Sequence, residues 1–369
     1  MKKAVIVIPT YNERGNIKQL VESIIQVSST TPNWEITILI VDSSSPDGTI
    51  LEVKELQNNY SNLHFIETKK EGLGKAYIAG FTYAIEHFNP FVLFEMDADL
   101  SHNPKYIPSF LAKIEKGADF VIGSRYIKGG SIPSNWGFHR KLFSTCANLF
   151  VRLGFMRLGT TDWTGGYRAI KVWVVKSALP HIHSYSGYVF QVALLDYAVN
   201  QKATLAEVPI RFIDRTEGIS KINSIQYIMQ TFLYVLTHSS FIKFVITGFL
   251  GFAVDFSFAY LFINTFHIAK TSANMISAEI AIISNFFINN FWSFKHKKIT
   301  GGIFGYLKKF VLFNLVSSGS ILIQGAGLAI LIHFFGDAGS IWILYKVLII
   351  ACVIIPYSYI LYNKVIWKK

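Results

Sequence analysis

The chain of 369 residues is poor in cysteine and in charged residues. Its two cysteines, Cys146 and Cys352, lie far apart with no partner at a metal-binding spacing, which excludes a disulfide framework and a zinc site. Charged residues make up only 16% of the sequence, whereas an ordinary soluble protein has about 25%. Because 51% of the residues are hydrophobic, the composition also excludes disordered and collagen-like chains.

The excess positive charge, +12 overall, lies in large part beside apolar runs, in basic clusters at 295–298, 308–309 and 368–369. Basic residues of this kind flank membrane spans on their cytoplasmic side. The placement therefore favours membrane lipid over nucleic acid as their partner, and we expect no nucleic-acid partner. A strand-like run follows the first three residues directly, so we also expect no signal peptide.

The most apolar part of the sequence follows Ser239. Each of its four long segments reaches the ~20 residues that a helix needs to cross ~30 Å of hydrocarbon. Short connections predict two helical hairpins, and the basic loop between them places both termini and the N-terminal part in the cytoplasm. A soluble protein with four buried helices is the alternative. We expect an α/β domain at 1–225, an amphipathic juxtamembrane linker at 226–240, and a membrane domain at 241–369 with spans at about 241–266, 272–294, 310–335 and 341–360.

The N-terminal part alternates apolar runs with helical patterns, which predicts an α/β domain with a mainly parallel sheet. Ligands bind such sheets beyond the carboxyl ends of the strands. Polar clusters follow three of the predicted strands, at Tyr11 and Glu13, at Asp42, and at Asp97 and Asp99. We therefore expect these side chains to meet at one edge of a nucleotide-binding sheet. The predicted strands include residues 4–8, 36–41, 63–66, 91–96 and 120–122.

Asp97 and Asp99 carry the clearest chemistry in the sequence. Two carboxylates that leave one strand can hold a hard divalent cation, which bridges the phosphates of a nucleotide-sugar and offsets the charge of the departing diphosphate. An isolated Asp-x-Asp is more often a solvated turn, but the polar clusters after two other strands favour a metal site here. Glu95 has the opposite strand parity, and we expect it to be structural.

A short glycine-rich segment, Gly72-Leu73-Gly74-Lys75, is a candidate phosphate loop at the start of a predicted helix. It lacks the full Walker pattern, so an ordinary N-terminal helical turn is an equally good interpretation. Lys75 is accordingly only a candidate contact of a donor diphosphate.

Basic residues in the second half of the α/β domain are candidate phosphate ligands. Near-helical spacing among apolar residues predicts an amphipathic helix with a cationic, hydroxyl-bearing face, formed by Arg140, Lys141, Ser144 and Arg152. Beside a membrane such a face suits a lipid-linked phosphate, since arginine binds phosphate bidentately. The alternative is a basic surface helix that binds anionic lipid. Arg215 and Lys221 lie in a Gly/Ser-containing loop, of the kind that closes over phosphates.

Seven short motifs occur along roughly the first 225 residues. They are PTYNE at 9–13, SPDGT at 45–49, GLG at 72–74, MDADLSH at 96–102, GSRY at 123–126, Asp162-x-Thr164-Gly165, and Arg215 with Gly218-x-Ser220-Lys221. Together these motifs resemble those of the polyprenol (dolichol) phosphate mannosyltransferases, which are inverting family 2 glycosyltransferases. The four apolar spans are similar to the small GtrA-type membrane domain that some of these transferases carry.

The resemblance implies a Rossmann-like GT-A catalytic domain and a role for each matched residue. Asp97, Asp99 and Ser101 are implied to hold Mg²⁺ or Mn²⁺, with Ser101 at a position where some relatives have Gln. There are two departures: Ser43 replaces the second Asp of the family's pair, and Ile219 replaces the usual Glu of the closing loop. The other implied roles are nucleotide-sugar contacts by Pro9, Tyr11, Glu13, Val41, Asp42, Ser43, Asp97, Ala98, Arg215 and Lys221, acceptor-phosphate contacts by Arg125, Arg140 and Ser144, and catalysis by Asp99, Asp162 and Arg215.

The implied reaction transfers mannose from GDP-mannose to polyprenyl or dolichyl phosphate at the cytoplasmic membrane face, with inversion to a β-linked product. A lipid phosphate, with a second pKa of about 6, is already anionic near pH 7. A general base is therefore optional, and positioning and charge neutralisation supply most of the rate. We expect Asp162 to orient the sugar or the acceptor, with base catalysis as a lesser option.

Several other functions share parts of this pattern. One is glucosyl transfer from UDP-glucose to polyprenyl phosphate, against which the SPDGT and MDADLSH segments favour GDP-mannose. A processive synthase is disfavoured because no Gln-x-x-Arg-Trp-like segment is present. A membrane transporter with a regulatory nucleotide domain predicts donor binding without turnover. Polar residues within the spans, such as Asp255 and Glu279, are compatible with lipid passage, although anchoring and helix packing are the simpler interpretation.

Overall fold

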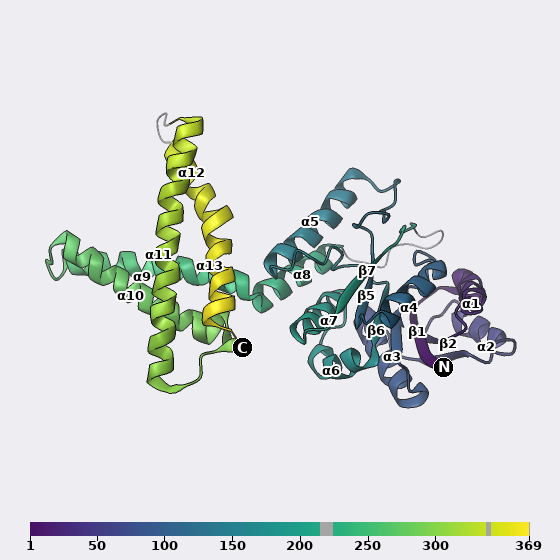
Figure 1. Cartoon of the computed structure of the whole chain (residues 1–369). Coiled ribbons are helices and arrows are strands. Elements are labelled where there is room, and N and C mark those ends of the chain that lie inside the picture. Colours follow the sequence, from purple (N-terminus) through teal and green to yellow (C-terminus); the bar gives the residue numbers. More distant parts are fainter. Residues whose placement is uncertain (215–223, 337–340, 369) are drawn as a thin grey trace. The chain divides into compact units, whose positions relative to one another are not determined.

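The computed structural model describes residues 1–214, 224–336 and 341–368, which form two compact units, Met1–Val235 and Leu236–Lys369. In its described part, the first unit contains a seven-stranded sheet and the helices that cover it (Figure 1). The strands are β1 (Lys2–Thr10), β2 (Trp34–Asp42), β3 (Leu63–Glu67), β4 (Val92–Glu95), β5 (Phe120–Ser124), β6 (Arg168–Lys171) and β7 (Leu205–Pro209). The helices are α1 (Arg14–Ser28), α2 (Thr49–Gln57), α3 (Leu73–Phe88), α4 (Ile107–Glu115) after a 3₁₀ turn at Pro104–Tyr106, α5 (Phe138–Gly154), α6 (Val172–Ile182), α7 (Val189–Asn200) and α8 (Ser224–His238).

The strands are arranged in the order β3-β2-β1-β4-β6-β5-β7. Strand β6 is antiparallel to its neighbours β4 and β5, whereas the other neighbours pair in parallel. The prediction of a mainly parallel sheet is therefore confirmed, with one reversed strand that the sequence pattern did not reveal. The register pairs Thr10 of β1 with Asp42 of β2 and Val7 of β1 with Glu95 of β4. These three strands consequently end at the same edge of the sheet.

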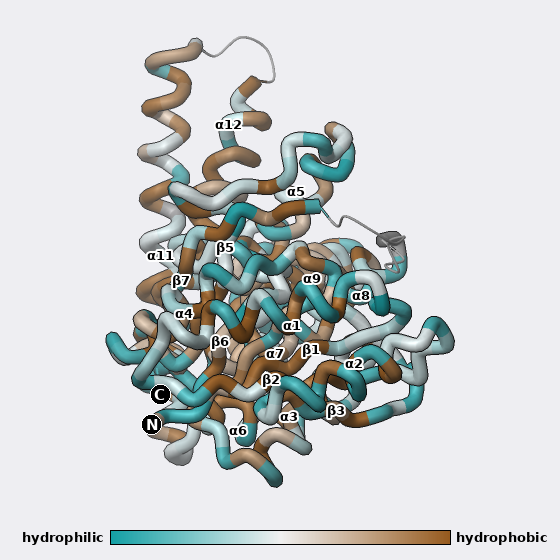
Figure 2. The backbone as a smooth tube through the Cα atoms, turned by 90° about the vertical axis from the view of Figure 1, so that its right-hand side faces the viewer, coloured by the Kyte–Doolittle hydropathy of each residue, from teal (hydrophilic) through white to brown (hydrophobic). Residues whose placement is uncertain are grey.

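Strand side chains alternate between two apolar layers. Ile6, Ile8 and the residues that share their face pack with α1, α2 and α4 in one large core cluster. On the opposite face, α3 lies so close to the sheet that a side chain on Gly80 would clash with Val7 and Val41, and α6 and α7 pack beside α3. Figure 2 shows the hydrophobic residues along the strands. Since each fully buried aliphatic side chain stabilises the fold by about 1.5–3 kcal/mol, this core holds the common strand edge in place.

The second unit contains, in its described part, four apolar helical segments that are long enough to cross a membrane, as the sequence predicted. Its elements are α9 (Ser240–Asn264), α10 (Lys270–Ile288), α11 (Gly302–Phe335), α12 (Ile341–Ile349) and α13 (Ile355–Leu361), with π-helical turns at Asn289–Ser293, Ile350–Ile354 and Tyr362–Ile366 and a 3₁₀ turn at Lys295–Lys297. α9 and α10 form one hairpin, and α11 forms the other with α12 and α13 (Figure 1). Helix α11 begins at Gly302 and contains the third predicted span, 310–335, because the helix already includes the residues before Phe310.

Asn290 ties the end of α10 to two other parts of the membrane unit. Its side chain is fully buried. The Oδ1 atom of Asn290 accepts hydrogen bonds from Trp367 Nε1 at 3.0 Å and from the backbone N–H of Ile299 at 2.7 Å. The amide nitrogen of Asn290 donates to the Tyr306 hydroxyl at 3.3 Å. A single amide therefore connects the loop between the hairpins with the last turn of the chain.

Replacing Asn290 with leucine is expected to destabilise the membrane unit by about 2–4 kcal/mol, because two buried N–H donors lose their acceptor. Thermal unfolding of the full chain in detergent micelles measures the effect. The control is Asn264→Leu, since the side chain of Asn264 is exposed and, among the residues that the structure describes, bonds only to the carbonyl of Tyr260 within its own helix. Equal unfolding temperatures for the two variants would contradict the role given to Asn290.

Candidate active site

A cleft of about 1030 Å³ lies in the first unit, at the edge where β1 and β4 end. It is lined by residues that follow β1, β2, β4 and β5 and by residues of α5 and α8. The side chains predicted for the donor and those predicted for the acceptor phosphate therefore border one space. Those that line it are Pro9, Tyr11, Glu13, Ser43, Asp97, Ala98, Asp99, Arg125, Arg140 and Ser144. Val41, Asp42, Ser101 and Asp162 are not part of the lining, and Arg215 and Lys221 lie outside the described residues.

The turn after β4 brings Asp97 and Asp99 to the cleft. Leu100 in this turn has a φ of 63°, a left-handed conformation that costs about 1–2 kcal/mol for an L-residue. In this conformation the backbone N–H and the hydroxyl of Ser101 donate to Asp99 Oδ1 at 3.1 and 2.6 Å. Ser101 is 2% exposed, so its hydroxyl orients the Asp99 carboxylate from behind the cleft wall.

His102 is a cleft residue to which the sequence assigned no role. The backbone N–H of Asp97 donates to His102 Nδ1 at 3.0 Å, which places the ring proton on Nε2. His102 Nε2 lies 3.8 Å from Asp97 Oδ2, and the ring stacks on Tyr167 with centroids 5.0 Å apart. The histidine therefore fixes the backbone of Asp97 and faces its carboxylate. Its place at the end of the MDADLSH segment was the available sequence signal.

The residues of this turn fit a hard divalent cation. Asp97 and Asp99 both contribute carboxylates to the cleft, and the side chain of Asp97 is 33% exposed. Mg²⁺ is commonly held by one or two carboxylates together with substrate phosphates. In the described residues no group of three or more His, Cys, Asp or Glu side chains could hold a metal by itself. The donor set is thus one that a nucleotide diphosphate would complete.

Arg125 lines the cleft in a bidentate ion pair with Asp162. Its Nε and Nη2 atoms donate to the two carboxylate oxygens of Asp162, each at 2.7 Å. Arg125 Nη2 also donates to Thr164 Oγ1 at 2.9 Å. Asp162 is fully buried and also accepts from the backbone N–H groups of Arg125 and Gly165. The polar turn predicted at Asp162 therefore serves to hold a cleft arginine.

The charges of this pair favour ionisation of both groups. Burial by itself would raise the pKa of Asp162, but the Arg125 guanidinium and the hydrogen bonds to the carboxylate hold it below its ordinary value. Burial would likewise lower the pKa of Arg125, and Asp162 reverses that effect and raises it. A fully bonded carboxylate with a lowered pKa is a poor proton acceptor. Its position suits orientation of Arg125 far better than base catalysis.

Arg140 and Ser144 reach the cleft from α5. The Arg140 guanidinium lies over the Trp136 ring at 3.9 Å and pairs with Asp214 at 3.5 Å. The hydroxyl of Ser144 is 2.6 Å from the Tyr126 hydroxyl. Arg140 and Ser144 of the predicted cationic, hydroxyl-bearing helix face therefore border the same cleft as Arg125. Arg152, which was predicted on the same face, is not part of the lining and donates to the carbonyl of Leu158.

The Asp42 carboxylate is buried and accepts hydrogen bonds from neighbouring residues of the sheet and the following loop. Its carboxylate accepts from Thr10 Oγ1 at 2.8 Å and from the hydroxyl and N–H of Ser45 at 2.6 and 2.8 Å, and it is 1% exposed. This leaves Ser43, the residue that departs from the family pattern, on the cleft wall. The same loop fixes the segment after β1, because the N–H groups of Asn12, Glu13 and Arg14 donate to the side chains of Ser45, Thr49 and Asp47, respectively.

The glycine-rich segment packs against another loop. Gly74 donates its N–H to the carbonyl of Ser186 at 2.8 Å, and a side chain on Gly74 would clash with the carbonyl of Tyr185. The Lys75 amine donates to the carbonyl of His183 at 2.7 Å and is not part of the cleft lining, whereas Gly72 and Leu73 are part of it. Helix α3 begins at Leu73, which is compatible with a phosphate loop and with an ordinary helical turn, and the structure favours neither interpretation. Lys70 reaches the cleft instead, with its amine 3.6 Å from the centre of the Tyr11 ring.

Glu95 and Arg168 form a buried pair beneath the cleft. Both side chains are 0% exposed, and Arg168 Nη1 lies 3.6 Å from Glu95 Oε2. Arg168 also donates to the carbonyls of Gln191 and Trp163, which connects β6 with α7. Burial raises the pKa of Glu95 to about 7 against the opposing charge of Arg168. The structural role predicted for Glu95 is therefore confirmed.

Helix α8 forms one wall of the cleft, although its sequence predicts a juxtamembrane linker. Its residues Gln226, Tyr227, Ile228 and Gln230 are part of the lining. The Tyr234 hydroxyl donates to Asp196 of α7 at 3.0 Å, and Phe232 stacks on Phe150 of α5. Burial raises the pKa of Asp196 to about 6, although hydrogen bonds from Tyr234 and Asn200 oppose the shift.

The first unit is expected to become less stable as the pH rises through about 6, because ionised Asp196 is buried. Since burial raises the folded-state pKa, the stabilising contribution is complete below about pH 4 and is lost at higher pH, with a total of about 3 kcal/mol. Asp196→Asn should remove this pH dependence and keep an acceptor for Tyr234. Unfolding temperatures between pH 4 and 8 test it, with Glu35→Gln of the exposed Lys3–Glu35 pair as control. Parallel pH profiles for wild type and Asp196→Asn would contradict the assignment.

Each of the two units matches a known protein family. Residues 5–174 match Glycosyl transferase family 2, and residues 243–367 match the GtrA/DPMS transmembrane domain. The chain is 32% identical to a dolichol-phosphate mannosyltransferase of Pyrococcus furiosus over 87% of its own length and 88% of that protein. It is 38% identical to a polyprenol monophosphomannose synthase of Mycolicibacterium smegmatis over 60% of its length and 82% of that protein. A solved glucosyl-3-phosphoglycerate synthase of Mycobacterium tuberculosis shows a distant likeness of fold, with a TM-score of 0.46 and 16% identity over 63% of this chain and 80% of that one.

The mixed α/β sheet with its Asp97-x-Asp99 turn is the GT-A-like domain of a glycosyltransferase. Four apolar spans after it make the protein an integral membrane protein. The chain belongs to the polyprenol (dolichol) phosphate mannosyltransferase family, in the form that carries a GtrA/DPMS transmembrane domain.

Proposed function

We propose that this enzyme transfers mannose from GDP-mannose to polyprenyl or dolichyl phosphate and inverts the anomeric configuration to give a β-linked lipid-phosphate mannose. Relatives named dolichol-phosphate mannosyltransferase and polyprenol monophosphomannose synthase support the sugar and the lipid class. The observation that carries the proposal is that one cleft is lined both by the carboxylates of Asp97 and Asp99 and by two arginines with a hydroxyl, those of Arg125, Arg140 and Ser144. Such a cleft can hold a metal-bound diphosphate and a second phosphate together.

The carboxylate side is the proposed donor site. Asp97 and Asp99, with Ser101 behind them, would hold Mg²⁺ or Mn²⁺, which supplies charge neutralisation for the departing diphosphate when bound. Arg215 and Lys221 are proposed to close on the same diphosphate. The nucleotide is proposed to contact Ala98 and the other predicted donor residues that line the cleft, Pro9, Tyr11, Glu13 and Ser43. The sequence also predicted contacts by Val41 and Asp42, but both are buried behind the lining and are not assigned to the nucleotide.

The cationic side is the proposed acceptor site. Arg125 uses Nε and Nη2 for Asp162 and Thr164, and its Nη1 has no hydrogen bond within the described residues. The Nη1 group can therefore donate to an anionic oxygen of the lipid phosphate. Arg140 and Ser144 add a second cation and a hydroxyl to the lining of the same cleft.

The reaction needs little proton transfer from the protein. An oxygen of the lipid phosphate attacks the anomeric carbon of the sugar while the bond to the departing diphosphate breaks on the opposite face, which gives inversion. Because the phosphate is anionic near pH 7, no base has to remove a proton from it. Asp162 is accordingly assigned to holding Arg125, in keeping with its lowered pKa and its complete set of hydrogen bonds.

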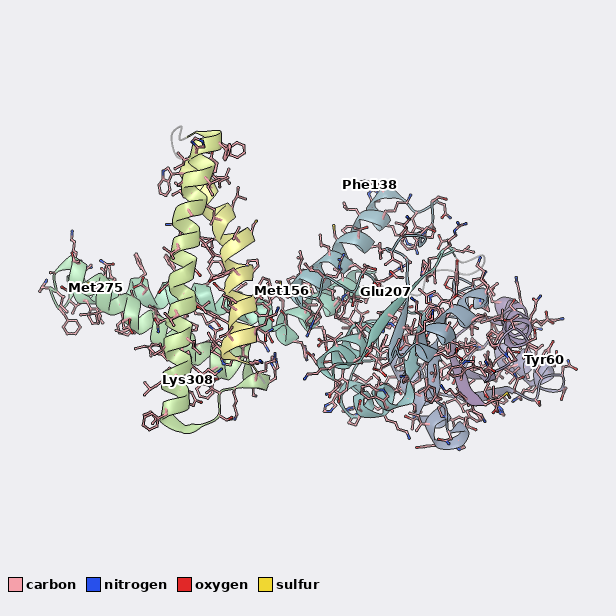
Figure 3. The ribbon with its side chains drawn as sticks, viewed as in Figure 1. Tyr60, Phe138, Met156, Glu207, Met275 and Lys308 are labelled. Atoms are coloured by element: carbon pink, nitrogen blue, oxygen red, sulfur yellow. The ribbon has the colours of Figure 1, made fainter. Side chains whose placement is uncertain are left out.

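The acceptor is proposed to reach the cleft from the bilayer along α5 and α8. Both helices expose large apolar side chains, among them Phe138, Leu142 and Phe143 of α5 and Met229 and Leu233 of α8. Figure 3 shows Phe138 at the start of α5. An amphipathic helix with such a face lies at the membrane interface. We place the catalytic unit in the cytoplasm, because the loop between the two membrane hairpins is rich in lysine.

The donor is tested by incubating membranes that contain the enzyme with radiolabelled GDP-mannose or UDP-glucose and a polyprenyl phosphate. We expect label from GDP-mannose in the lipid fraction and a β-linkage in the isolated product. Incorporation only from UDP-glucose would assign the alternative, a polyprenyl-phosphate glucosyltransferase. Donor binding without product would identify a transporter with a regulatory domain, and a growing polymer would identify a processive synthase.

The membrane unit is proposed to anchor the enzyme. A flipping assay that compares the full chain with one truncated near Ser239 tests the alternative of lipid passage. Equal translocation by both chains supports anchoring alone, and faster translocation by the full chain supports passage.

A further inference from the structure

We propose that Glu207 of β7 is a positioning residue, which sets Arg125 for the acceptor phosphate through the segment at residues 161–162. The proposal rests on the proposed function, since it assigns Arg125 to the acceptor. Glu207 does not line the cleft, and it lies beside β5 in register with Ile122. Figure 3 labels Glu207 on β7. Its influence on the reaction therefore passes through other residues.

The first step from Glu207 to the cleft concerns the hydrogen bonds that hold the Arg125 side chain. One edge of its guanidinium is occupied by Asp162, and the direction of the remaining Nη1 group is therefore set by the position of the Asp162 carboxylate. The side chain of Asp162 is 0% exposed, so no solvent takes part in placing it. A shift of the Asp162 backbone would turn the arginine in the cleft.

The second step is the anchor of the Asp162 backbone. Glu207 Oε1 accepts from the N–H of Asp162 at 3.3 Å and from the N–H of Thr161 at 3.1 Å. It also accepts from the Thr161 hydroxyl at 2.6 Å. One carboxylate thus collects three donors from two consecutive residues, which fixes the segment that carries Asp162.

A second connection runs from Glu207 to the start of the arginine's own loop. The Thr161 hydroxyl, which donates to Glu207, lies 2.7 Å from Ser124 Oγ, and the N–H of Tyr126 donates to that same oxygen. Arg125 stands between Ser124 and Tyr126 in the chain. Glu207 is therefore linked both to the partner of Arg125 and to the backbone on either side of it.

Asp119 provides a matched control. Its carboxylate also accepts three hydrogen bonds, from Lys171 Nζ at 3.0 Å, Trp173 Nε1 at 3.2 Å and the N–H of Thr204 at 2.9 Å. Asp119 precedes β5, at the end opposite to Arg125, and is not part of the cleft lining. Asp119→Asn should thus weaken the sheet edge to a similar degree without reaching Arg125.

The test measures initial rates of the full-length enzyme against polyprenyl phosphate and, separately, against the nucleotide-sugar. We expect Glu207→Ala to lower kcat/KM for the acceptor by about 10- to 100-fold, because a misplacement of about 1 Å has effects of that size. The donor KM should stay within about twofold of wild type. Glu207→Gln should recover most of the activity, since its carbonyl can take the place of Oε1. Asp119→Asn should lower the unfolding temperature without changing the acceptor kcat/KM.

A loss that is equal for donor and acceptor, or that follows the unfolding temperature across all three variants, overturns the proposal. The rate at which phenylglyoxal modifies Arg125, followed by mass spectrometry, provides a second readout without turnover. Faster modification in Glu207→Ala than in wild type and Asp119→Asn supports the positioning role, and an unchanged rate overturns it. If wild type transfers no sugar to polyprenyl phosphate, the proposed function fails, while the modification rate still decides the role of Glu207.

Discussion

Replacing Asp99 with alanine is expected to lower mannosyl transfer by about 10²- to 10³-fold or more, the loss that follows removal of one electrostatic partner of a transition state. Asp99 borders the cleft beside Asp97, and these two carboxylates are the proposed cation ligands. Without Asp99 the charge on the departing diphosphate loses much of its compensation. The fold should persist, because the side chain contacts the turn and Ser101 instead of the apolar core.

The Asp99→Asn variant distinguishes the effect of losing the negative charge from the effect of losing the side chain. Asparagine keeps an oxygen that can accept from the Ser101 hydroxyl and N–H, so it preserves the turn while removing the negative charge. We expect it to be nearly as inactive as Asp99→Ala, with an unfolding temperature close to wild type. Chelation should abolish wild-type transfer, and Mg²⁺ or Mn²⁺ should restore it. Turnover by Asp99→Asn that matches wild type, with or without chelator, would reject the metal assignment.

The strand-end clusters were the most predictive part of the sequence. Tyr11, Glu13, Asp97 and Asp99 could be expected at one edge because buried strands with polar residues at their carboxyl ends converge in a parallel sheet. The structure brings all four to one cleft. The spacing of Arg140 and Ser144 likewise predicted a helix face, and the structure places both on α5 at the same cleft.

Contacts between segments that lie far apart in the chain could not be predicted from the sequence. Strand β6 lies between β4 and β5 in the sheet but follows both in the chain, and its direction depends on the whole excursion from 125 to 167. The amine of Lys75 bonds to a carbonyl 108 residues away, and no local pattern indicates which lysine faces the cleft. Asp42 of β2 accepts a hydrogen bond from Thr10 of β1, so the burial of its carboxylate could not be predicted without the register of the two strands.

The Arg125–Asp162 pair shows why a single substitution there would mix two effects. Arg125→Met is expected to lower acceptor kcat/KM by about 10²- to 10³-fold and the stability of the catalytic unit by about 3–5 kcal/mol. The activity is lost because the cleft loses its guanidinium. The stability is lost because Asp162, which is fully buried, keeps its charge without a cation. Kinetics with polyprenyl phosphate and thermal unfolding measure the two losses separately.

The double variant Arg125→Met/Asp162→Asn distinguishes them. Asparagine removes the unpaired charge and keeps an oxygen that can accept from the N–H groups of Arg125 and Gly165, so most of the lost stability should return. Activity should remain as low as in Arg125→Met, because no cation has been restored to the cleft. Recovery of transfer together with stability would show that Arg125 serves only the fold, and would remove it from the acceptor site. A stable, inactive double variant that still binds the nucleotide-sugar would instead place the loss at the phosphate of the lipid.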